Sequence, residues 1–375
     1  MRIKKRAALL SLVYILLTPV AFSSVNLLDD INYTFDQTKL NASLDTFHFM
    51  RSFVDYYYRL AAINRKNLNV FQKTEQFSGW CAGDAHAENF GILLLENGST
   101  TFTINDMDDS GPCPIVLDLM RILASSRLYN PNIKTQNILN SYMDGLQGKT
   151  VSIPATIDSM SMEASAKGIQ IASKDLQGKS FKRKSSMSEV DLQSKTLLIS
   201  MLQNQFQDES LKVLDIVANS KIGGGSGGLL RFEILISNSK NQLIHLELKE
   251  LVTPSIAPVA TSALPDQATR MKNSLEIDQG KNYSHYYNIF NFQEKSFLLR
   301  PKFSGNLGVT LSNLNDIEIE EIINYESYIL GKIHAKSVNI KEYGQAINSL
   351  ILESWQEDIS AMTELFNKKF SELKK

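Results

Sequence analysis

The residues best suited to chemistry lie in the acidic stretch that begins at Gly83. Four residues separate Asp84 from Asn89, which is the Asp-x-x-x-x-Asn spacing of a phosphotransferase catalytic loop. In such a loop the aspartate accepts a proton from the attacking hydroxyl, and the asparagine holds a metal ion. Asp106 ends a β-rich run, so a strand could deliver a second metal ligand beside Asn89. The spacing predicts a phosphoryl-transfer site with Asp84 as base and Mg²⁺ or Mn²⁺ on Asn89 and Asp106.

A β-hairpin is predicted between the two metal ligands. Residues 91–95 and 100–104 have the composition of strands, and Glu-Asn-Gly-Ser at 96–99 is typical of a tight turn. The hairpin would bring Asp106, at its exit, back to Asn89, at its entrance. Because Mg²⁺ is usually held by one or two side chains plus phosphates and water, these two residues suffice for a site.

His86 and the acidic residues after Asp106 have more than one interpretation. His86 could ligate a metal, shuttle a proton or fix the loop by hydrogen bonding, and we keep it in the catalytic group. We favour the loop-fixing role, because a histidine suits a Mg²⁺ site poorly. Asp108 and Asp109 could merely decorate a turn. Alternatively, Asp106 and Asp108 could join Asp84 and His86 in a metallohydrolase site that uses metal-bound water.

A second candidate segment is rich in glycine and lies far along the chain. Gly223, Gly225 and Gly228 satisfy Gly-x-Gly-x-x-Gly, and Ser226 lies between them. In a dinucleotide fold these glycines would open a helix, whereas here strands are predicted after them. A glycine-rich hairpin followed by Lys249 at the end of a strand is the arrangement with which kinases bind the phosphates of ATP.

The helices around these segments are predicted from the spacing of apolar residues. The spacing predicts one helix over 44–60 and another over 115–129. The second helix carries Asp118, a carboxylate among core residues that needs partners, and the backbone of the catalytic loop is a suitable one. A helix after Pro265 offers Glu276 as the ion-pair partner of Lys249. Two more helical stretches are expected over 317–336 and 347–373.

Composition limits the other classes of function. The chain has 375 residues, of which 43% are hydrophobic and 21% charged, so it can form a sizeable core. The 39 basic and 40 acidic side chains nearly cancel, which gives no indication of a nucleic-acid partner. Cys81 and Cys113 make neither a disulfide scaffold nor a zinc site, and the sequence leaves open whether they form a single bridge. We expect a monomer acting on a small molecule or a protein.

Residues 1–23 have the pattern of a secretory signal peptide. Basic residues precede an apolar run from Ala7 to Phe22, and small residues precede a possible cleavage site after Ser23. The run is short for a membrane span, which needs about 20 apolar residues, and an uncleaved anchor is the alternative. We therefore expect an exported protein, periplasmic or secreted, that has no further membrane segment.

A series of short blocks resembles the landmarks of one bacterial family, domain of unknown function 2252. The blocks are Phe47–Arg51, Gly83–Gly91, Asn105–Asp108, Gly111-Pro, Leu117–Arg121, Gly223–Gly228, Leu248–Glu250 and His334–Ser337. In pattern the family is similar to the aminoglycoside-phosphotransferase branch of kinase-like folds. That resemblance implies ATP, Mg²⁺ and the roles given above for Asp84, Asn89, Asp106 and Lys249. Asn273 stands where the kinase-like pattern implies a glutamate.

The order of the segments differs from that of a kinase, because the glycine-rich segment follows the catalytic loop. We predict an α+β, two-lobed protein-kinase-like fold in circularly permuted order, which is tolerable when the original termini lie close together. The predicted units are a signal peptide at 1–23, part of the large lobe at 24–150, a polar insert or linker at 151–210, a small glycine-loop lobe at 211–303 and the C-terminal helices of the large lobe at 304–375.

These expectations combine into an exported, ATP- and Mg²⁺-dependent phosphotransferase acting on a hydroxyl of an unknown substrate. Two alternatives remain open. One is a metal-dependent phosphohydrolase in which the glycine-rich hairpin is incidental. The other is a non-catalytic, pseudokinase-like module that only binds a nucleotide. Export argues against ATP as the donor, because ATP is expected to be scarce in a periplasm.

Overall fold

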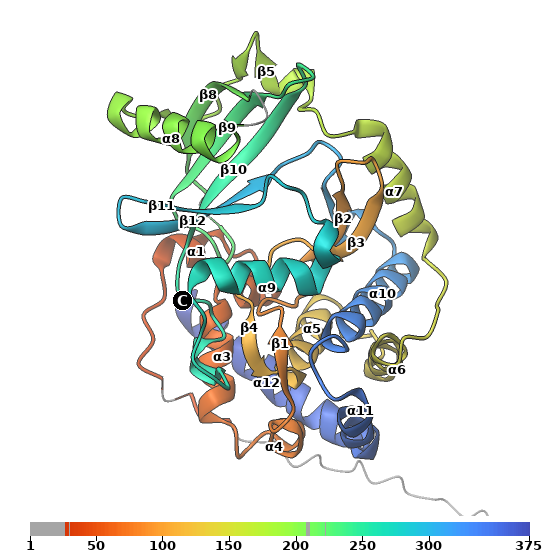
Figure 1. Cartoon of the computed structure of the whole chain (residues 1–375). Coiled ribbons are helices and arrows are strands. Elements are labelled where there is room, and N and C mark those ends of the chain that lie inside the picture. The colour runs from red at the N-terminus through yellow and green to blue at the C-terminus, as the bar shows by residue number, and fades with distance from the viewer. Residues whose placement is uncertain (1–26, 30, 208–210, 222) are drawn as a thin grey trace, which may run out of the picture.

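Helices and antiparallel sheets alternate along this chain in a mixed α+β fold (Figure 1). The computed structural model describes residues 27–29, 31–207, 211–221 and 223–375. The predicted signal peptide, residues 1–23, lies outside these ranges. Among the described helices, none combines the length and apolar character that crossing a membrane requires.

A six-stranded antiparallel sheet forms the β-rich part of the molecule, at the top of Figure 1. The strands lie in the order β11-β12-β10-β9-β8-β7. They are β7 (Met187–Glu189), β8 (Lys212–Asn219), β9 (Arg231–Ser237), β10 (Leu243–Leu251), β11 (Asn288–Phe292) and β12 (Lys295–Pro301). Ile234, Ile236 and Leu246 pack with Leu198 of α8 (Leu192–Gln205), so this face of the sheet is apolar. Because side chains alternate along a strand, the charged residues of β9 and those of β10 except Glu250 lie on the other face.

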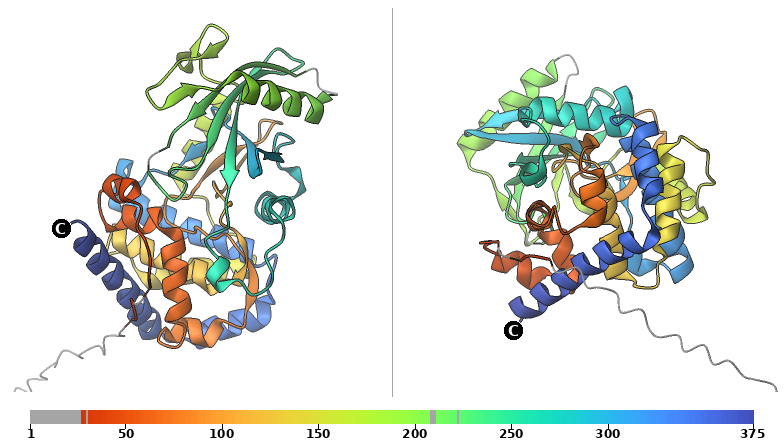
Figure 2. Two further views of the ribbon diagram at one scale, coloured as in Figure 1. Left: turned by 90° about the vertical axis from the view of Figure 1, so that its left-hand side faces the viewer. Right: turned by 90° about the horizontal axis from the view of Figure 1, so that it is seen from below.

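The remaining helices share one large hydrophobic core. They are α1 (Gln37–Ala42), α2 (Thr46–Ser52), α3 (Val54–Ile63), α4 (Asn69–Thr74), α5 (Val116–Tyr129), α6 (Thr135–Leu146), α7 (Ala155–Lys167), α9 (Gln267–Gln279), α10 (Asp316–His334), α11 (Ile340–Ser349) and α12 (Leu352–Leu373). Figure 2 shows α12 crossing the base of this part, where it contacts α2, α4 and α5. The core is filled by large side chains such as Tyr57, Trp355 and Phe366, which are almost completely buried.

Two small sheets position the segments predicted to be functional. The predicted hairpin is present as β2 (Phe90–Leu94) and β3 (Thr100–Ile104), and β13 (Leu307–Gly308) pairs with the other edge of β2. β1 (Ser78–Cys81) pairs with β4 (Gly111–Pro114). Cys81 and Cys113 form a disulfide between these strands, with their Cα atoms 5.8 Å apart. The segment 82–110, called the acidic loop below, therefore leaves one strand of the cross-linked ladder, contains the β2–β3 hairpin and returns to the other strand.

Two predicted helices are each divided in the structure. In place of one helix over 44–60, α2 and α3 meet at Phe53, whose φ of −120° and ψ of 64° are not helical. The ring of Phe53 packs edge-on against Phe35, so tertiary packing accounts for this break. The apolar stretch 347–373 is divided at Leu350, an extended and buried residue between α11 and α12.

The segment 151–210, predicted as a polar insert or linker, contains regular structure. α7 contacts β2 and β3, and β7 pairs with β8 as the last strand of the six-stranded sheet. The ladder of β5 (Leu176–Gln177) and β6 (Ser180–Phe181) lies between them in sequence. Arg183 donates a 2.6 Å hydrogen bond to the buried Asp215 of β8. An ion pair therefore joins this segment to the sheet.

Candidate functional site

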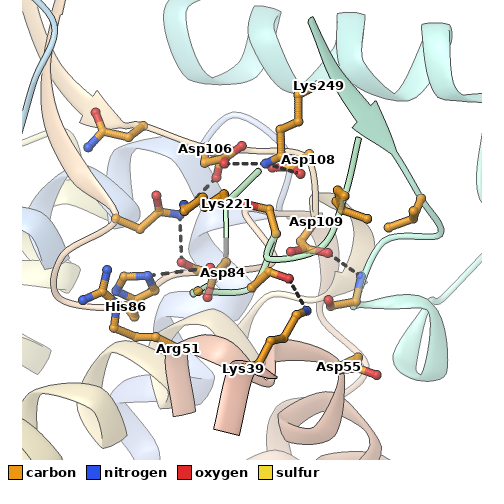
Figure 3. Close-up of a pocket in the computed structure, with 18 of the residues that line it drawn as sticks. Lys39, Arg51, Asp55, Asp84, His86, Asp106, Asp108, Asp109, Lys221 and Lys249 are labelled. Atoms are coloured by element: carbon orange, nitrogen blue, oxygen red, sulfur yellow. Dashed lines mark hydrogen bonds and ion pairs between the residues drawn. The ribbon is translucent and has the colours of Figure 1, made fainter. Parts of the chain in front are cut away.

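A cavity of about 470 Å³ lies between the glycine-rich segment and the acidic loop (Figure 3). Most of the predicted site residues line it: Asp84, His86, Asn89, Asp106, Gly225, Ser226 and Lys249. Gly224 also belongs to the lining, whereas the predicted Gly223 and Gly228 lie outside it. The structure therefore brings together two segments that are far apart in the sequence.

Asp84 is held by a buried arginine of α5. Arg121 donates from Nε (3.0 Å) and Nη2 (2.5 Å) to Asp84 Oδ1, and its guanidinium lies 5.0 Å from the centre of the Tyr57 ring. Burial raises the pKa of the Asp84 carboxyl to about 7, although the charge of Arg121 opposes that shift. Because Arg121 occupies Oδ1, the second carboxylate oxygen is the one that can accept a proton from a ligand.

Asp118 fixes the backbone that precedes Asp84. Its carboxylate accepts hydrogen bonds from the backbone N–H groups of Ala82 (2.6 Å) and Gly83 (3.2 Å) and from the Tyr58 hydroxyl (3.0 Å). Nε2 of the buried His334 lies 3.1 Å from the same carboxylate. Asp118 therefore finds partners in the backbone that leads to Asp84, as expected for a buried carboxylate.

His86 contacts both the loop backbone and Asp84. Its Nδ1 accepts a hydrogen bond from the Glu88 N–H at 3.1 Å. Burial, with the nearby charges of Arg51 and Arg121, holds the pKa of His86 well below its usual range, so the ring is neutral. A neutral ring that accepts at Nδ1 carries its proton on Nε2, which lies 3.6 Å from Asp84 Oδ2. The bond to Glu88 is of the loop-fixing kind, and any part of His86 in chemistry stays a prediction.

Asn89 and Asp106 meet as the hairpin prediction requires. Asn89 Nδ2 donates to the backbone carbonyls of Asp84 and Asp106, both at 3.0 Å, so its amide oxygen remains available for a cation. Asp106 Oδ1 is buried without a hydrogen-bond donor. Such oxygens fit Mg²⁺, which takes hard ligands and completes its shell with phosphate and water. Within the described ranges, no group of three His, Cys, Asp or Glu side chains is arranged to hold a metal by itself.

Lys249, on β10, reaches from the sheet to the acidic loop. Its Nζ lies 2.7 Å from Asp106 Oδ2 and 2.6 Å from Asp108 Oδ2, and only 1% of its side chain is exposed. These aspartates are its partners in place of the predicted Glu276. Despite burial, Lys249 and Arg300 hold the pKa of Asp106 well below its usual range. Burial and the charge of Asp106 raise the pKa of Asp108, so Asp108 is the member of the pair that holds a proton more readily.

The glycine-rich segment approaches the N-terminal helices closely. Lys39 Nζ donates to the Gly225 carbonyl at 2.6 Å, and a Cβ on Gly225 would lie 3.1 Å from Val54 Cγ2. Gly224 has a φ of +78°, a conformation that favours glycine. Arg231 donates to the Ser226 hydroxyl at 2.9 Å. The segment thus closes one side of the cavity with backbone and a small side chain, which lets a ligand approach the main chain.

A family model described as an uncharacterized protein conserved in bacteria (DUF2252) matches residues 42–137 and 165–366. The chain belongs to this family. No match was found among curated proteins or among solved structures. The matched ranges of the DUF2252 chain contain every predicted site residue. The interval between them carries most of α6 and of α7.

Sequence reasoning missed several cations of this DUF2252 site. Lys39, Lys221 and Arg300 line the cavity, and the ion pair from Arg121 to Asp84 was not foreseen. Lys221 stands two positions before Gly223, and Arg300 ends the strand-like run 296–300, so both positions were visible in the sequence beside recognisable patterns. Lys39 had no such signal, because its contact with Gly225 spans 186 positions.

Proposed function

We propose that this DUF2252 protein is an exported phosphotransferase. It transfers a phosphoryl group from ATP, or another nucleotide, to a hydroxyl of a substrate with Mg²⁺ or Mn²⁺. The observation that carries the proposal is the 2.7 Å contact between Lys249 Nζ and Asp106 Oδ2, which joins positions 143 residues apart. A lysine, a metal-ligand candidate and glycine backbone on one cavity form the combination that phosphoryl transfer needs.

The proposed architecture is a two-lobed, protein-kinase-like fold in circularly permuted order. In support, β8, the glycine-rich segment, β9 and the Lys249-bearing β10 follow one another as in the small lobe of a kinase. The acidic loop precedes them in the chain and still lies against them in space. In this proposal the six-stranded sheet belongs to the small lobe, and the helices around α5, α10 and α12 belong to the large lobe.

The proposed chemistry assigns each side of the cavity a task. Asp84 accepts the hydroxyl proton through Oδ2 while Arg121 fixes its other oxygen. Asn89 and Asp106 would hold the metal, which offsets charge on the transferring phosphoryl group. When a metal takes Asp106, Lys249 would donate instead to phosphate oxygens, which accept charge-assisted hydrogen bonds as carboxylates do.

Export is part of the proposal. The signal-peptide pattern of residues 1–23 supports it, and so does the Cys81–Cys113 disulfide, because disulfides persist in oxidising compartments. ATP is expected to be scarce there. The protein must therefore use a different phosphoryl donor or act where ATP is present.

Thermal shift of the mature chain tests the proposed function. We expect Mg²⁺ or Mn²⁺ together with a nucleotide to raise the Tm of the wild type, because a ligand that binds only the folded state stabilises it. The variants Asp106→Ala and Lys249→Ala should lose most of that increase, and Lys149→Ala, on the surface at α6, should keep it. A wild-type Tm that no nucleotide changes would contradict the proposal.

Measurements of turnover distinguish the phosphotransferase from the two alternative functions. A phosphotransferase consumes the donor faster when its acceptor is present, and Asp84→Asn abolishes this increase. A metal-dependent phosphohydrolase would release phosphate from simple phosphate esters and tolerate Lys249→Ala. A non-catalytic module would be stabilised by nucleotide without turnover, and Asp84→Asn would then change nothing.

A further inference from the structure

Charged side chains gather on the face of the six-stranded sheet that carries Lys249. We call it the cleft face, because Lys249 reaches the first cavity from it. Lys249 points to Asp106, so the residues on the same side of β9 and β10 face the cleft as well. The charged or ionisable residues among them are Arg231, Glu233, His245 and Glu247. Sites for flat organic groups are lined mainly by hydrophobic and aromatic side chains. Here most apolar residues of both strands point instead to α8, on the opposite face. Leu235, Leu243 and Leu251 share the charged side, but they pack into separate clusters with Phe181 or Leu298 and line neither the first cavity nor the second one described below.

The charges on this face form a buried ion-pair network. Glu247 accepts hydrogen bonds from Arg231 (2.6 Å) and Arg300 (2.8 and 2.9 Å), and Glu233 accepts one from Lys302 (3.2 Å). Both glutamates are 1% exposed. Burial opposes their ionisation, but the neighbouring cations hold the pKa of each below its usual range. Because breaking a buried pair costs about 3–5 kcal/mol, a neutral base stacked here could not displace the network.

Three cationic side chains line the first cavity, where the proposed function places the phosphates. Lys221, Lys249 and Arg300 all line the first cavity. Among the described residues, none accepts a hydrogen bond from Lys221 Nζ, which is drawn with the cavity residues in Figure 3 and interacts electrostatically with Asp106. Burial and the charges of Arg231, Lys249 and Arg300 lower the pKa of Lys221. A bound anion would relieve this crowding of like charges.

A second cavity adjoins these three cations, and cations outnumber its one carboxylate, Asp175. It has a volume of about 730 Å³ and shares Asn105 and Arg300 with the first cavity. Its lining includes Lys167, Lys174, His245 and Lys302. Arg300 therefore stands where the two cavities meet, with cations on either side. Tyr287 and Phe303 also line the second cavity, so a base stacked there is the alternative that an experiment must exclude.

We propose that the cleft recognises a chain of phosphates rather than a nucleobase, so that inorganic polyphosphate is a phosphoryl donor. The inference rests on the proposed function. The terminal phosphate lies at Asp84, Asn89 and Asp106, and the chain runs past Arg300 toward Lys302. The acceptor oxygen forms a bond to the terminal phosphorus, and the adjoining P–O–P bond breaks. The hydroxyl proton goes to Asp84, and a polyphosphate one unit shorter leaves. Such a donor does not depend on ATP outside the cytoplasm.

Binding of donors that differ in their base tests this inference. The mature chain with Mg²⁺ is titrated with pyrophosphate, tripolyphosphate, longer linear polyphosphate, ATP and CTP. We expect tripolyphosphate to bind at least as tightly as ATP, ATP and CTP to bind alike, and longer chains to bind more tightly. Weaker binding of tripolyphosphate than of ATP, or a difference above about tenfold between ATP and CTP, would overturn the inference and leave the proposed function intact. If none of these ligands binds, the proposed function itself fails.

Variants that remove one positive charge test whether the polyphosphate runs through the second cavity. Lys302→Gln should weaken binding of the longer polyphosphate by about two- to fivefold, as expected for an exposed ion pair, and leave pyrophosphate unchanged. Lys174→Gln, on an exposed residue outside the sheet, should act in the same direction without disturbing Glu233. Lys149→Gln removes the same charge from a remote surface and should have no effect. Equal affinity of all four proteins for the longer chain would contradict the proposed path.

Discussion

The two segments that enclose the cavity are held in unequal ways. On the acidic loop, Asp118 binds the backbone at Ala82 and Gly83, and Arg121 grips Asp84, with both of these α5 side chains completely buried. On the glycine-rich segment, the contacts of the described residues are made mostly by main-chain atoms and by the hydroxyl of Ser226. One wall of the cavity is therefore fixed by the core of the protein, and the other is defined by the lack of side chains.

This difference predicts separate roles for the acidic loop and the glycine-rich segment. A proton acceptor must be held in one orientation, and buried ion pairs and hydrogen bonds give that orientation. Phosphates, in contrast, are bound by backbone N–H groups that must be approached closely, and glycine permits this. Substitutions behind the acidic loop should therefore act on stability and proton transfer. Substitutions in the glycine-rich segment should act on ligand binding.

The largest effect is expected for Asp84→Asn. Loss of a general base should lower turnover by about 10²–10⁴-fold, while the ligand-induced rise in Tm persists because the metal and phosphate contacts remain. Steady-state kinetics with the phosphate donor measures the change. Asp55→Asn is the matched control, since Asp55 lines the same cavity but bonds to Tyr33 rather than to Arg121. A variant at Asp84 that turns over like the control would remove the aspartate from the mechanism.

The second-largest effect is expected when the acidic loop loses the contacts that Asp118 makes with its backbone. Asp118→Ala should lower the free energy of unfolding by about 3–5 kcal/mol, because His334 and two backbone N–H groups lose a buried charged partner. Urea unfolding followed by circular dichroism gives the value. Asp158→Ala, at an exposed position in the first turn of α7, should cost less than about 1 kcal/mol. Similar costs for both would mean that the acidic loop is not held from α5.

The pH dependence of turnover reports on Arg121. Asp84 acts as a base only when deprotonated, and its pKa is about 7, so turnover should rise as pH increases through about 7. Arg121 lowers this pKa, and its replacement in Arg121→Met should move the rise upward by about 1–3 pH units. Arg121→Lys keeps the charge and should shift the profile less while still lowering turnover. A profile that is identical in all three proteins would separate Asp84 from the titrating group.

The smallest effect is expected in the glycine-rich segment. Gly224 has a φ of +78°, so Gly224→Ala should strain the segment by about 1–2 kcal/mol and weaken donor binding accordingly. Gly223→Ala is the control, because its added Cβ would meet only Ala42 Cβ, at 3.4 Å. Calorimetric titration compares the two variants. If both bind the donor equally, the backbone conformation at Gly224 does not matter for the ligand.

Local patterns predicted one part of the site well, and tertiary contacts decided the rest. The hairpin that returns Asp106 to Asn89 follows from strand composition and a tight turn, which are both local. The partners of Lys249 could not be found in this way. The helix predicted after Pro265 suggested Glu276, whereas two aspartates 143 and 141 positions away bind Lys249.

The same limit applies to the fold. Apolar spacing placed the helices that contain α5 and α10, but it ran through the break at Phe53, where packing against Phe35 overrides helical propensity. The bridge between Cys81 and Cys113 depends on a strand pairing across the acidic loop, which cysteine spacing does not reveal. Polar composition predicted an insert or linker over 151–210, but composition does not reveal that Arg183 of this segment binds a carboxylate of the sheet.

The most direct measurement of the central claim is the linkage between metal and phosphate binding. Titrations of ATP and of tripolyphosphate are made with and without Mg²⁺, on the wild type and on Asp106→Ala. If both walls hold one metal-bound phosphate chain, Mg²⁺ should strengthen donor binding by about 5–150-fold in the wild type, and Asp106→Ala should abolish that coupling. Donor binding that is independent of Mg²⁺, or a coupling that survives in Asp106→Ala, would contradict the account.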